Sequence, residues 1–326
     1  MTKQPRRAAV IGAGLCGLTC AHDLAQEGWD VQVFDKSRGL GGRLAVKRLP
    51  DLGNVDLGAQ FMTASTVAFA TLLATAAAKG YVAPWQGSVA YLTAKGREEA
   101  REQVRWVGVP GMNTWLTELW PRQAVRFEER IESCDRLADG RWVINDKRDK
   151  LYDAVILAMP PAQAADLARG TSLEAPLRSV PMTPCWAGLA LFERSLRVDF
   201  VAAFIRGGQL DWIANNQTKP GRTEHPAAWT IHAGGALSTQ LIDQPKEVVA
   251  KHLMMAVAAE IGIDLPPGHI ELTHLWRYAS PQLATAPGIL WDANIGLGAG
   301  GDWAIGGRVE GAFTAGKQLA AAVCAS

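Results

Sequence analysis

Three glycines near the start of the chain have the spacing of a phosphate-binding turn. Gly12, Gly14 and Gly17 directly follow the apolar run at residues 8–11. In such a turn the first glycine permits a tight bend, the second lets the backbone approach a pyrophosphate, and the third lets a helix pack closely on a sheet. Asp35 ends the next apolar run, where a carboxylate can accept hydrogen bonds from ribose hydroxyls. These four residues predict a dinucleotide site.

In the segments around these residues, apolar side chains recur at the spacings typical of strands and helices. The run at 8–11 predicts a strand, the helical spacing of apolar residues from Leu15 onward predicts a helix, and residues 30–35 predict a second strand. Leu15 and Cys16 would open the helix, whose first backbone N–H groups are free to bind phosphates. Cys16 and Cys20 would share one helix face, either as a redox couple or, as we favour, as small packing residues.

A second glycine-rich segment starts at Asp35 and reads Asp-Lys-Ser-Arg-Gly-Leu-Gly-Gly-Arg. It resembles the two-glycine segment of FAD-dependent oxidoreductases of the amine oxidase type. In those proteins the glycines let the backbone approach the adenine-side phosphates and ribose, and an arginine adds a charge-assisted contact. The alternative is a flexible surface loop with solvated arginines, which explains the glycines but not their position. The resemblance implies that FAD contacts Lys36, Arg38, Gly41, Gly42 and Arg43.

A third glycine-rich segment lies near the other end of the chain and leads into a helical pattern. In the same flavoprotein families a Gly-Asp pair in this place binds the ribityl chain and the pyrophosphate. The resemblance implies that Asp302 accepts a hydrogen bond from a ribityl hydroxyl. A helix from about Val309 would place partial positive charge near the flavin pyrimidine edge, whereas the alternative is a glycine-rich loop that caps a helix. The expected cofactor contacts are Gly301, Asp302, Arg308, Val309, Glu310 and Ala312.

The apolar run at residues 152–159 ends in two prolines and predicts a buried parallel strand that brings Ala158 to the cofactor. Residues 125–132 and 141–144 predict a hairpin inserted between strands. This order of parts predicts an α/β fold with a Rossmann-like FAD-binding domain and a substrate domain with a mainly antiparallel sheet. We expect the FAD-binding domain to comprise residues 1–60, 120–161 and 286–326, and the substrate domain to comprise residues 61–119 and 162–285.

Six segments together resemble the bacterial renalase family: residues 56–64, 106–112, 211–220, 229–233, 274–279 and 301–312. The resemblance implies a two-domain FAD-binding fold of the p-hydroxybenzoate hydroxylase type with non-covalent FAD. It implies an enzyme that oxidises the 2-dihydro and 6-dihydro isomers of NAD(P) and passes the electrons to molecular oxygen, giving hydrogen peroxide. The family has also been assigned amine oxidase activity, so a flavin amine oxidase is the alternative. The further FAD contacts implied are Gln60, Phe61, Pro110 and Met112.

Two positions depart from the pattern of that family. The family has a tyrosine where this chain has Phe61, and a tryptophan-containing stretch where this chain has residues 234–237. Both changes remove polar or aromatic surface from the substrate cavity and leave the flavin contacts untouched. The resemblance therefore defines the cofactor better than the substrate.

Residues from the middle of the chain are expected to form a substrate site over the flavin. Oxidation at flavin N5 needs a C–H donor held near the ring in a dry slot, and a dihydronicotinamide can give a hydride without a general base. His232 is a candidate ligand contact, with a buried core histidine as the equal alternative. Lys219 and Arg222 flank a Pro-Gly pair, and although they could hydrogen-bond a nucleotide-like substrate, we favour a surface turn for both. The expected catalytic residues are His232, Gln60, Phe61, Trp186 and Trp212, with core packing as the alternative for the tryptophans.

The composition excludes several classes of protein. The 326 residues suggest two domains, and a net charge of +1 gives no field to attract nucleic acid or an anionic membrane. The sequence contains no apolar run long enough to cross a bilayer and no motif of a serine hydrolase, a nucleotide hydrolase or a metalloenzyme, so no metal is expected. We expect a cytoplasmic monomer or weak dimer whose partners are a small-molecule substrate and oxygen. A non-catalytic flavin-fold binding protein is the remaining alternative.

Overall fold

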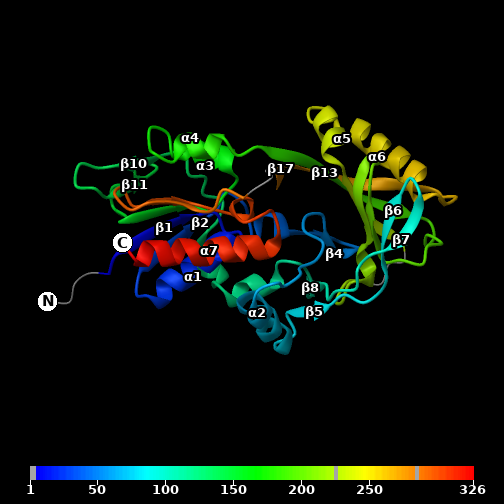
Figure 1. The fold of residues 1–326 in the computed structure, drawn as a ribbon, viewed down its shortest axis with the longest axis horizontal. Helices are drawn as coiled ribbons and strands as arrows, with labels where there is room; N and C mark the ends of the chain where they lie inside the picture. Colours follow the sequence, from blue (N-terminus) through cyan, green and yellow to red (C-terminus); the bar gives the residue numbers. More distant parts are fainter. Residues whose placement is uncertain (1–4, 224–226, 283–285) are drawn as a thin grey trace.

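The computed structural model describes residues 5–223, 227–282 and 286–326. Two large β-sheets organise these residues, and they lie at opposite ends of an elongated molecule (Figure 1). Two helices lie along the first sheet, α1 (Leu15–Gln26) and α7 (Val309–Cys324), and two lie beside the second, α5 (Gly235–Gln240) and α6 (Lys246–Ile261) (Figure 1). Within the described ranges, no helix has both the length and the apolar character that a membrane crossing requires.

Six strands form the first sheet, in the order β18-β19-β12-β1-β2-β9. Neighbouring strands pair in parallel except β18 and β19, which are antiparallel. Every residue of β12 is buried, as expected for a strand covered on both faces. The predicted parallel Rossmann-type sheet is therefore confirmed. The bounds are β1 Arg7–Ile11, β2 Asp30–Phe34, β9 Val125–Arg126, β12 Ala154–Leu157, β18 Leu290–Asp292 and β19 Leu297–Ala299.

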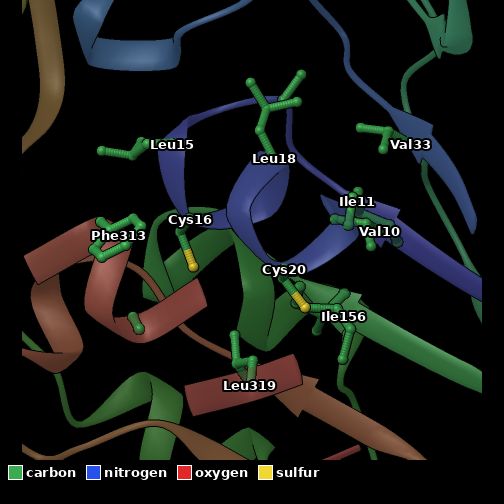
Figure 2. Close-up of a cluster of buried hydrophobic side chains, with 14 of the residues drawn as sticks. Val10, Ile11, Leu15, Cys16, Leu18, Cys20, Val33, Ile156, Phe313 and Leu319 are labelled. Carbon is green, nitrogen blue, oxygen red and sulfur yellow. The ribbon is translucent and has the colours of Figure 1, made fainter. Parts of the chain in front are cut away.

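Helix α1 (Leu15–Gln26) and helix α7 (Val309–Cys324) pack closely against each other. Gly316 permits this approach, because an ideal Cβ at that position would lie only 2.4 Å from the backbone oxygen of Cys16. Cys16 and Cys20 lie within the buried cluster between the helices and the sheet (Figure 2). Both are free thiols, and burial raises the pKa of Cys20 well above its ordinary value. These cysteines are packing residues and not a redox couple.

The hairpin predicted from residues 125–132 and 141–144 is placed wrongly. The first of these segments contributes β9, which pairs in parallel with β2 at the edge of the first sheet. The hairpin consists of β10 (Cys134–Arg136) and β11 (Trp142–Ile144), which pair antiparallel. Val125 is buried beside Val33 of β2, so burial in the sheet outweighs the local hairpin pattern.

Seven strands form the second sheet, in the order β17-β13-β16-β15-β14-β6-β7. Neighbouring strands are antiparallel except β14 and β6, which are parallel. The predicted mainly antiparallel sheet is therefore confirmed. The bounds are β6 Val89–Thr93, β7 Gly96–Glu99, β13 Met182–Phe192, β14 Ala202–Ile205, β15 Leu210–Asn215, β16 Ala228–Ala233 and β17 Gly268–Pro281.

The two faces of this second sheet pack against different partners. Helices α5 (Gly235–Gln240) and α6 (Lys246–Ile261) cover one face and share a buried cluster with Trp186. Ala187, the next residue of β13, belongs to a different cluster that contains Leu57. This alternation follows from the strand, in which successive side chains point to opposite faces. One face therefore forms a core with the helices, and the other face looks toward the first sheet.

Smaller elements connect the two sheets. The segment that follows β4 (Gly53–Asp56) contacts small elements and the second sheet. Ala59 N donates to Arg43 O at 2.9 Å, Met62 N donates to Trp106 O at 2.7 Å, and Leu57 O accepts from His232 Nε2 of β16. This segment carries Gln60 and Phe61 of the expected site. The remaining bounds are β3 Val46–Leu49, β4 Gly53–Asp56, β5 Val82–Pro84, β8 Trp106–Gly108, α2 Val67–Ala78, α3 Pro161–Leu167 and α4 Glu174–Arg178.

Candidate functional site

One cavity of about 1650 Å³ is lined by residues of both large sheets. Pockets for small molecules usually enclose roughly 300–1,000 Å³. This cavity therefore has room for a dinucleotide together with a second small ligand. The expected site residues that line it are Gly12, Gly14, Leu15, Cys16, Asp35, Lys36, Arg38, Gly41, Gly42, Arg43, Gln60, Phe61, Ala158, Trp212, His232, Gly301, Asp302, Arg308, Val309 and Ala312.

The glycine turn at one end of the cavity has three distinct tasks. Gly12 has a φ of 117°, and an ideal Cβ there would lie 2.2 Å from the backbone oxygen of Ala158. A Cβ on Gly17 would lie 2.0 Å from Gly12 O, so this glycine allows close packing and does not itself line the cavity. Gly14 has open space where its Cβ would be. It precedes α1, which has no side-chain cap and no acidic residue in its first turn. The N-terminus of α1 is thus available to an anion.

Asp35 ties this turn to the second glycine-rich segment. Its Oδ2 accepts a hydrogen bond from Ala13 N at 2.7 Å, and its Oδ1 accepts from Ser37 N at 2.7 Å and from Ser37 Oγ at 2.6 Å. A carboxylate has about four acceptor sites, so one site stays available toward the cavity that Asp35 lines. The neighbouring Arg38 side chain is 90% exposed and pairs with Glu128, as a solvated arginine would.

Arg43 and Asp302 form an ion pair in the lining of the cavity. Arg43 Nη1 donates to Asp302 Oδ2 at 3.0 Å and to Ala279 O at 2.7 Å, and Arg43 Nη2 donates to Asp302 Oδ1. Both residues were expected from the sequence to contact the cofactor, but this pair was not predicted. The guanidinium of Arg43 reaches across to the C-terminal glycine-rich segment, and both residues line the cavity. The pair joins two segments that are remote in sequence.

Four of the residues expected to contact a cofactor do not line the cavity: Gly17, Pro110, Met112 and Glu310. Glu310 instead accepts hydrogen bonds from Thr66 N and Thr66 Oγ1, both at 2.7 Å, and so caps the start of α2. Met112 N donates to Asp56 Oδ1 at 3.2 Å. Pro110 O accepts from Asn54 Nδ2 at 3.0 Å. These residues support the walls of the cavity and do not face it.

Three aromatic rings form what we call the aromatic chamber at the other end of the cavity: Phe61, Phe204 and Trp212. The ring centroids of Phe204 and Trp212 are 4.6 Å apart, and Phe61 lies 5.5 Å from Trp212 and 6.3 Å from Phe204. All three rings line the cavity. Flat apolar surfaces of this kind favour a planar ligand.

His232 lies beside the chamber, directly across from Trp212 in the register of β15 and β16. Its Nε2 is 2.9 Å from Leu57 O, and because a carbonyl can only accept, Nε2 is the donor. Burial lowers the pKa of His232 to about 4. The ring is therefore neutral near pH 7, and Nδ1 is a hydrogen-bond acceptor.

Trp186 was expected at the site and is not there. Its Nε1 donates to Leu241 O at 3.0 Å beneath α5, whereas Cys185, the preceding residue, lines the cavity. The alternation of side chains along β13 explains the error. Trp186 is a core residue of the second sheet.

The interpretation of Lys219 and Arg222 as a surface turn is wrong. Both side chains are completely buried, and with Asp56 they form what we call the Asp56 cluster. Lys219 Nζ and Arg222 Nη2 lie 3.0 and 2.6 Å from Asp56 Oδ2. Lys219 Nζ also donates to Gln60 Oε1 at 3.0 Å.

The cluster changes the protonation of its members. Burial lowers the pKa of Lys219 to about 8, although Asp56 opposes this effect. For Asp56, burial favours the neutral acid, but the two adjacent cations more than offset it and lower its pKa. No local sequence pattern indicates this arrangement, because Asp56 is the last residue of a short strand and its partners lie in a segment with the composition of a turn.

Comparisons with known proteins agree with this architecture. Residues 10–74 match the family model of an NAD(P)-binding Rossmann-like domain. A zeta-carotene-forming phytoene desaturase from Myxococcus xanthus is 58% identical over 40 residues, which are 12% of this chain. The match spans 8% of the desaturase, so it concerns a small part of that protein.

Two solved structures match almost the whole chain. A protein from Exiguobacterium sp. 255-15, provisionally named a protoporphyrinogen oxidase, superimposes with a TM-score of 0.75 at 12% identity over 98% of both chains. Cyclohexylamine oxidase from Brevibacterium oxydans IH-35A superimposes with a TM-score of 0.73 at 13% identity, over 98% of this chain and 99% of the oxidase. At such identities the likeness shows the fold alone. The chain has the two-domain α/β fold of the flavin amine oxidases, with a parallel Rossmann sheet and a mainly antiparallel substrate-domain sheet.

Proposed function

We propose that this protein is an FAD-dependent oxidoreductase of the renalase type, which oxidises the 2-dihydro and 6-dihydro isomers of NAD(P) with oxygen as electron acceptor. The observation that carries the proposal is the continuity of one cavity from the glycine turn at Gly14 to the aromatic chamber. A planar reduced ring in the chamber would meet the ring of a dinucleotide cofactor held along the glycine-rich segments.

The residues fit non-covalent FAD. Gly14 leaves open the space that a side chain would fill, and Asp35 keeps one acceptor site toward the cavity. Helix α7 begins at Val309 without a side-chain cap, and Val309 lines the cavity. Asp302 and Arg43 would contact the middle of the cofactor. These residues would hold FAD, which when bound would supply a hydride acceptor; the two electrons would pass to oxygen, and the proton of the hydride with one proton from solvent would complete hydrogen peroxide.

The chemistry of the chamber favours a hydride donor that needs no general base. The neutral His232 can accept a hydrogen bond at Nδ1, but a pKa of about 4 makes it a weak base. Phe61, Phe204 and Trp212 orient a planar ring and exclude water. A dihydronicotinamide meets both conditions, because it loses a hydride without losing a proton.

A small amine is the second candidate substrate, and Asp211 is the observation that favours it. This carboxylate belongs to an exposed residue that lines the cavity and precedes Trp212 in β15, and partial desolvation raises its pKa. Among the residues that the structure describes, none forms an ion pair with Asp211. An ammonium group could bind there beside the aromatic chamber.

We also propose the division into an FAD-binding domain of residues 1–60, 120–161 and 286–326 and a substrate domain of residues 61–119 and 162–285. Membership of the sheets supports it. The first three ranges contain all six strands of the first sheet, and the other two contain all seven strands of the second.

Anaerobic mixing of the purified protein with each substrate class tests the proposal. We expect the flavin absorbance to bleach rapidly with 6-dihydro or 2-dihydro NAD(P), and hydrogen peroxide to form when air is admitted. Ordinary NADH and a panel of primary amines serve as matched controls. Bleaching by amines alone would assign the protein to amine oxidation. A protein that stays colourless after incubation with FAD would be a binding protein without redox activity.

A further inference from the structure

The Asp56 cluster contains more positive than negative charge. Lys219 and Arg222 share the single carboxylate of Asp56, and all three side chains are at most 1% exposed. No second carboxylate pairs with them in residues 5–223, 227–282 and 286–326. Asp302, which lines the adjoining cavity, is already paired with Arg43. A buried excess of positive charge creates a strong local field, because no water screens it.

Each of the two cations has fixed hydrogen-bond partners. Arg222 Nη1 donates to Gly108 O at 2.9 Å and to Pro220 O at 3.0 Å. Lys219 Nζ bonds to Asp56 and Gln60, and it lies 5.1 Å from the centre of the Trp85 ring. The charges therefore cannot turn toward solvent.

The excess charge lies directly behind the cavity wall. Gln60 lines the cavity, and its Oε1 accepts from Lys219 Nζ while its Nε2 donates to Asp56 O at 2.6 Å and to Gly58 O at 3.0 Å. On the same segment, Leu57 O accepts hydrogen bonds from His232 Nε2 and Trp276 Nε1, each at 2.9 Å. The side chain of Gln60 thus stands between the ammonium group and the cavity.

We infer that Lys219 is a positioning residue that acts through Gln60 and makes the adjoining part of the cavity favour negative charge, so that it raises the reduction potential of a flavin bound there. The inference rests on the proposed FAD site. It gives a function to a lysine that makes no contact with the cavity. Reduction adds electrons to the ring, and a fixed positive charge nearby favours the species that carries them.

The charge of Lys219 should depend on pH within an accessible range. The titratable and charged groups that face it are Asp56, Arg222 and His232. Asp56 is ionised and His232 is neutral near pH 7. With a pKa of about 8, Lys219 is charged at pH 6.5 and neutral at pH 9.5. The effect on the flavin should therefore be present at the lower pH and absent at the higher one.

A spectroscopic redox titration of the flavin-loaded protein at pH 6.5 and pH 9.5 tests this inference. At pH 6.5 we expect Lys219→Met to lower the ratio of reduced to oxidised flavin at a fixed potential about tenfold, which is about 30 mV for a two-electron couple. At pH 9.5 the variant and the wild type should agree. Lys79→Met, which removes an exposed lysine paired with Glu118, should match the wild type at both pH values.

Lys219→Arg keeps the charge at every pH and serves as the second variant. Between pH 6.5 and 9.5 the reduction potential of the wild-type flavin should fall further than that of Lys219→Arg, because only the wild type loses the charge at position 219. Equal potentials of Lys219→Met and wild type at pH 6.5, or an equal fall in Lys219→Arg, would overturn the inference while the flavin site stands. A wild-type protein that binds no FAD would overturn the proposed function and this inference with it.

Discussion

The two ends of the cavity are built by different means. The nucleotide end consists largely of backbone and missing side chains, as at Gly12 and Gly14, and its β1, glycine turn, α1 and β2 follow one another along the chain. The substrate end consists of side chains such as Phe61, Trp212 and His232, which come from remote segments and rest on a buried ionic cluster. The first end should therefore be sensitive to added side chains, and the second to the loss of side chains.

Adding a side chain at Gly14 should have the largest effect of these changes, because it should abolish FAD binding. Because Gly14 has a φ of −80° and open space at its Cβ position, Gly14→Val should fold but occupy the volume expected for a pyrophosphate. We expect loss of FAD during gel filtration, with the melting temperature of the flavin-free protein lowered by no more than about 4 °C. Gly14→Ala should lie between this variant and the wild type. Stoichiometric FAD in Gly14→Val would show that the backbone of this turn does not face the cofactor.

Removing the central carboxylate of the Asp56 cluster should have the next largest effect. Asp56→Asn leaves Lys219 and Arg222 buried without a counter-ion and should lower the free energy of unfolding by about 3–5 kcal/mol. Urea denaturation measures the loss. Asp139→Asn breaks an exposed pair with Arg141 and is the matched control, which should unfold almost as the wild type does. Equal midpoints for the two variants would show that the cluster does not stabilise the substrate end.

The neutral state of His232 should make the protein sensitive to acid. Its pKa falls from an ordinary 6.5 to about 4 on folding, because burial disfavours the charged ring. Between these two values the unfolded chain binds a proton that the folded protein does not. The free energy of unfolding should therefore fall by up to about 3 kcal/mol as the pH drops from 6.5 to 4.

The matched variant is His232→Gln, which keeps a donor for Leu57 O and removes the titrating ring. Urea midpoints at pH 7, 5.5 and 4.5 give the comparison. The same loss of stability in wild type and variant would mean that His232 is protonated in the folded protein.

Asp302 tests the junction between the two ends. Asp302→Ala removes the proposed polar contact with the cofactor and breaks the pair with Arg43, so FAD should bind about 10–100-fold more weakly. Fluorescence titration of the flavin-free protein measures this. Asp23→Ala, which removes the partner of Lys317 on the outer side of α7, is the control. Retention of stoichiometric flavin by Asp302→Ala after gel filtration would remove the assignment.

Substitution of Trp212 should have the smallest effect of these changes, on the rate of flavin reduction, and Trp186 provides the control. Trp212→Leu should slow the reduction of the flavin by a dihydronicotinamide about tenfold, because one wall of the aromatic chamber is lost. Trp186→Leu alters the core under α5 and should leave this rate unchanged. Equal rates for the two variants would contradict the assignment of the chamber as substrate site.

The difference between the two ends also explains what could be predicted from the sequence. The turn at Gly12 and the start of α7 at Val309 were predictable because glycine spacing and helical periodicity are local signals. The Asp56 cluster was not, because it depends on tertiary contacts between segments with no local pattern. Trp186 was misplaced for a related reason, since its face of β13 is decided by the helices that cover the sheet.

A crystal structure of the protein with FAD and an oxidised nicotinamide nucleotide tests the central claim most directly, because that claim assigns one ligand to each end of one cavity. The proposal predicts the FAD pyrophosphate against Gly14 and the first turn of α1, and the nicotinamide ring beside Phe61, Trp212 and His232. A nicotinamide bound at the glycine turn in place of FAD, or a nicotinamide ring outside the aromatic chamber, would contradict it.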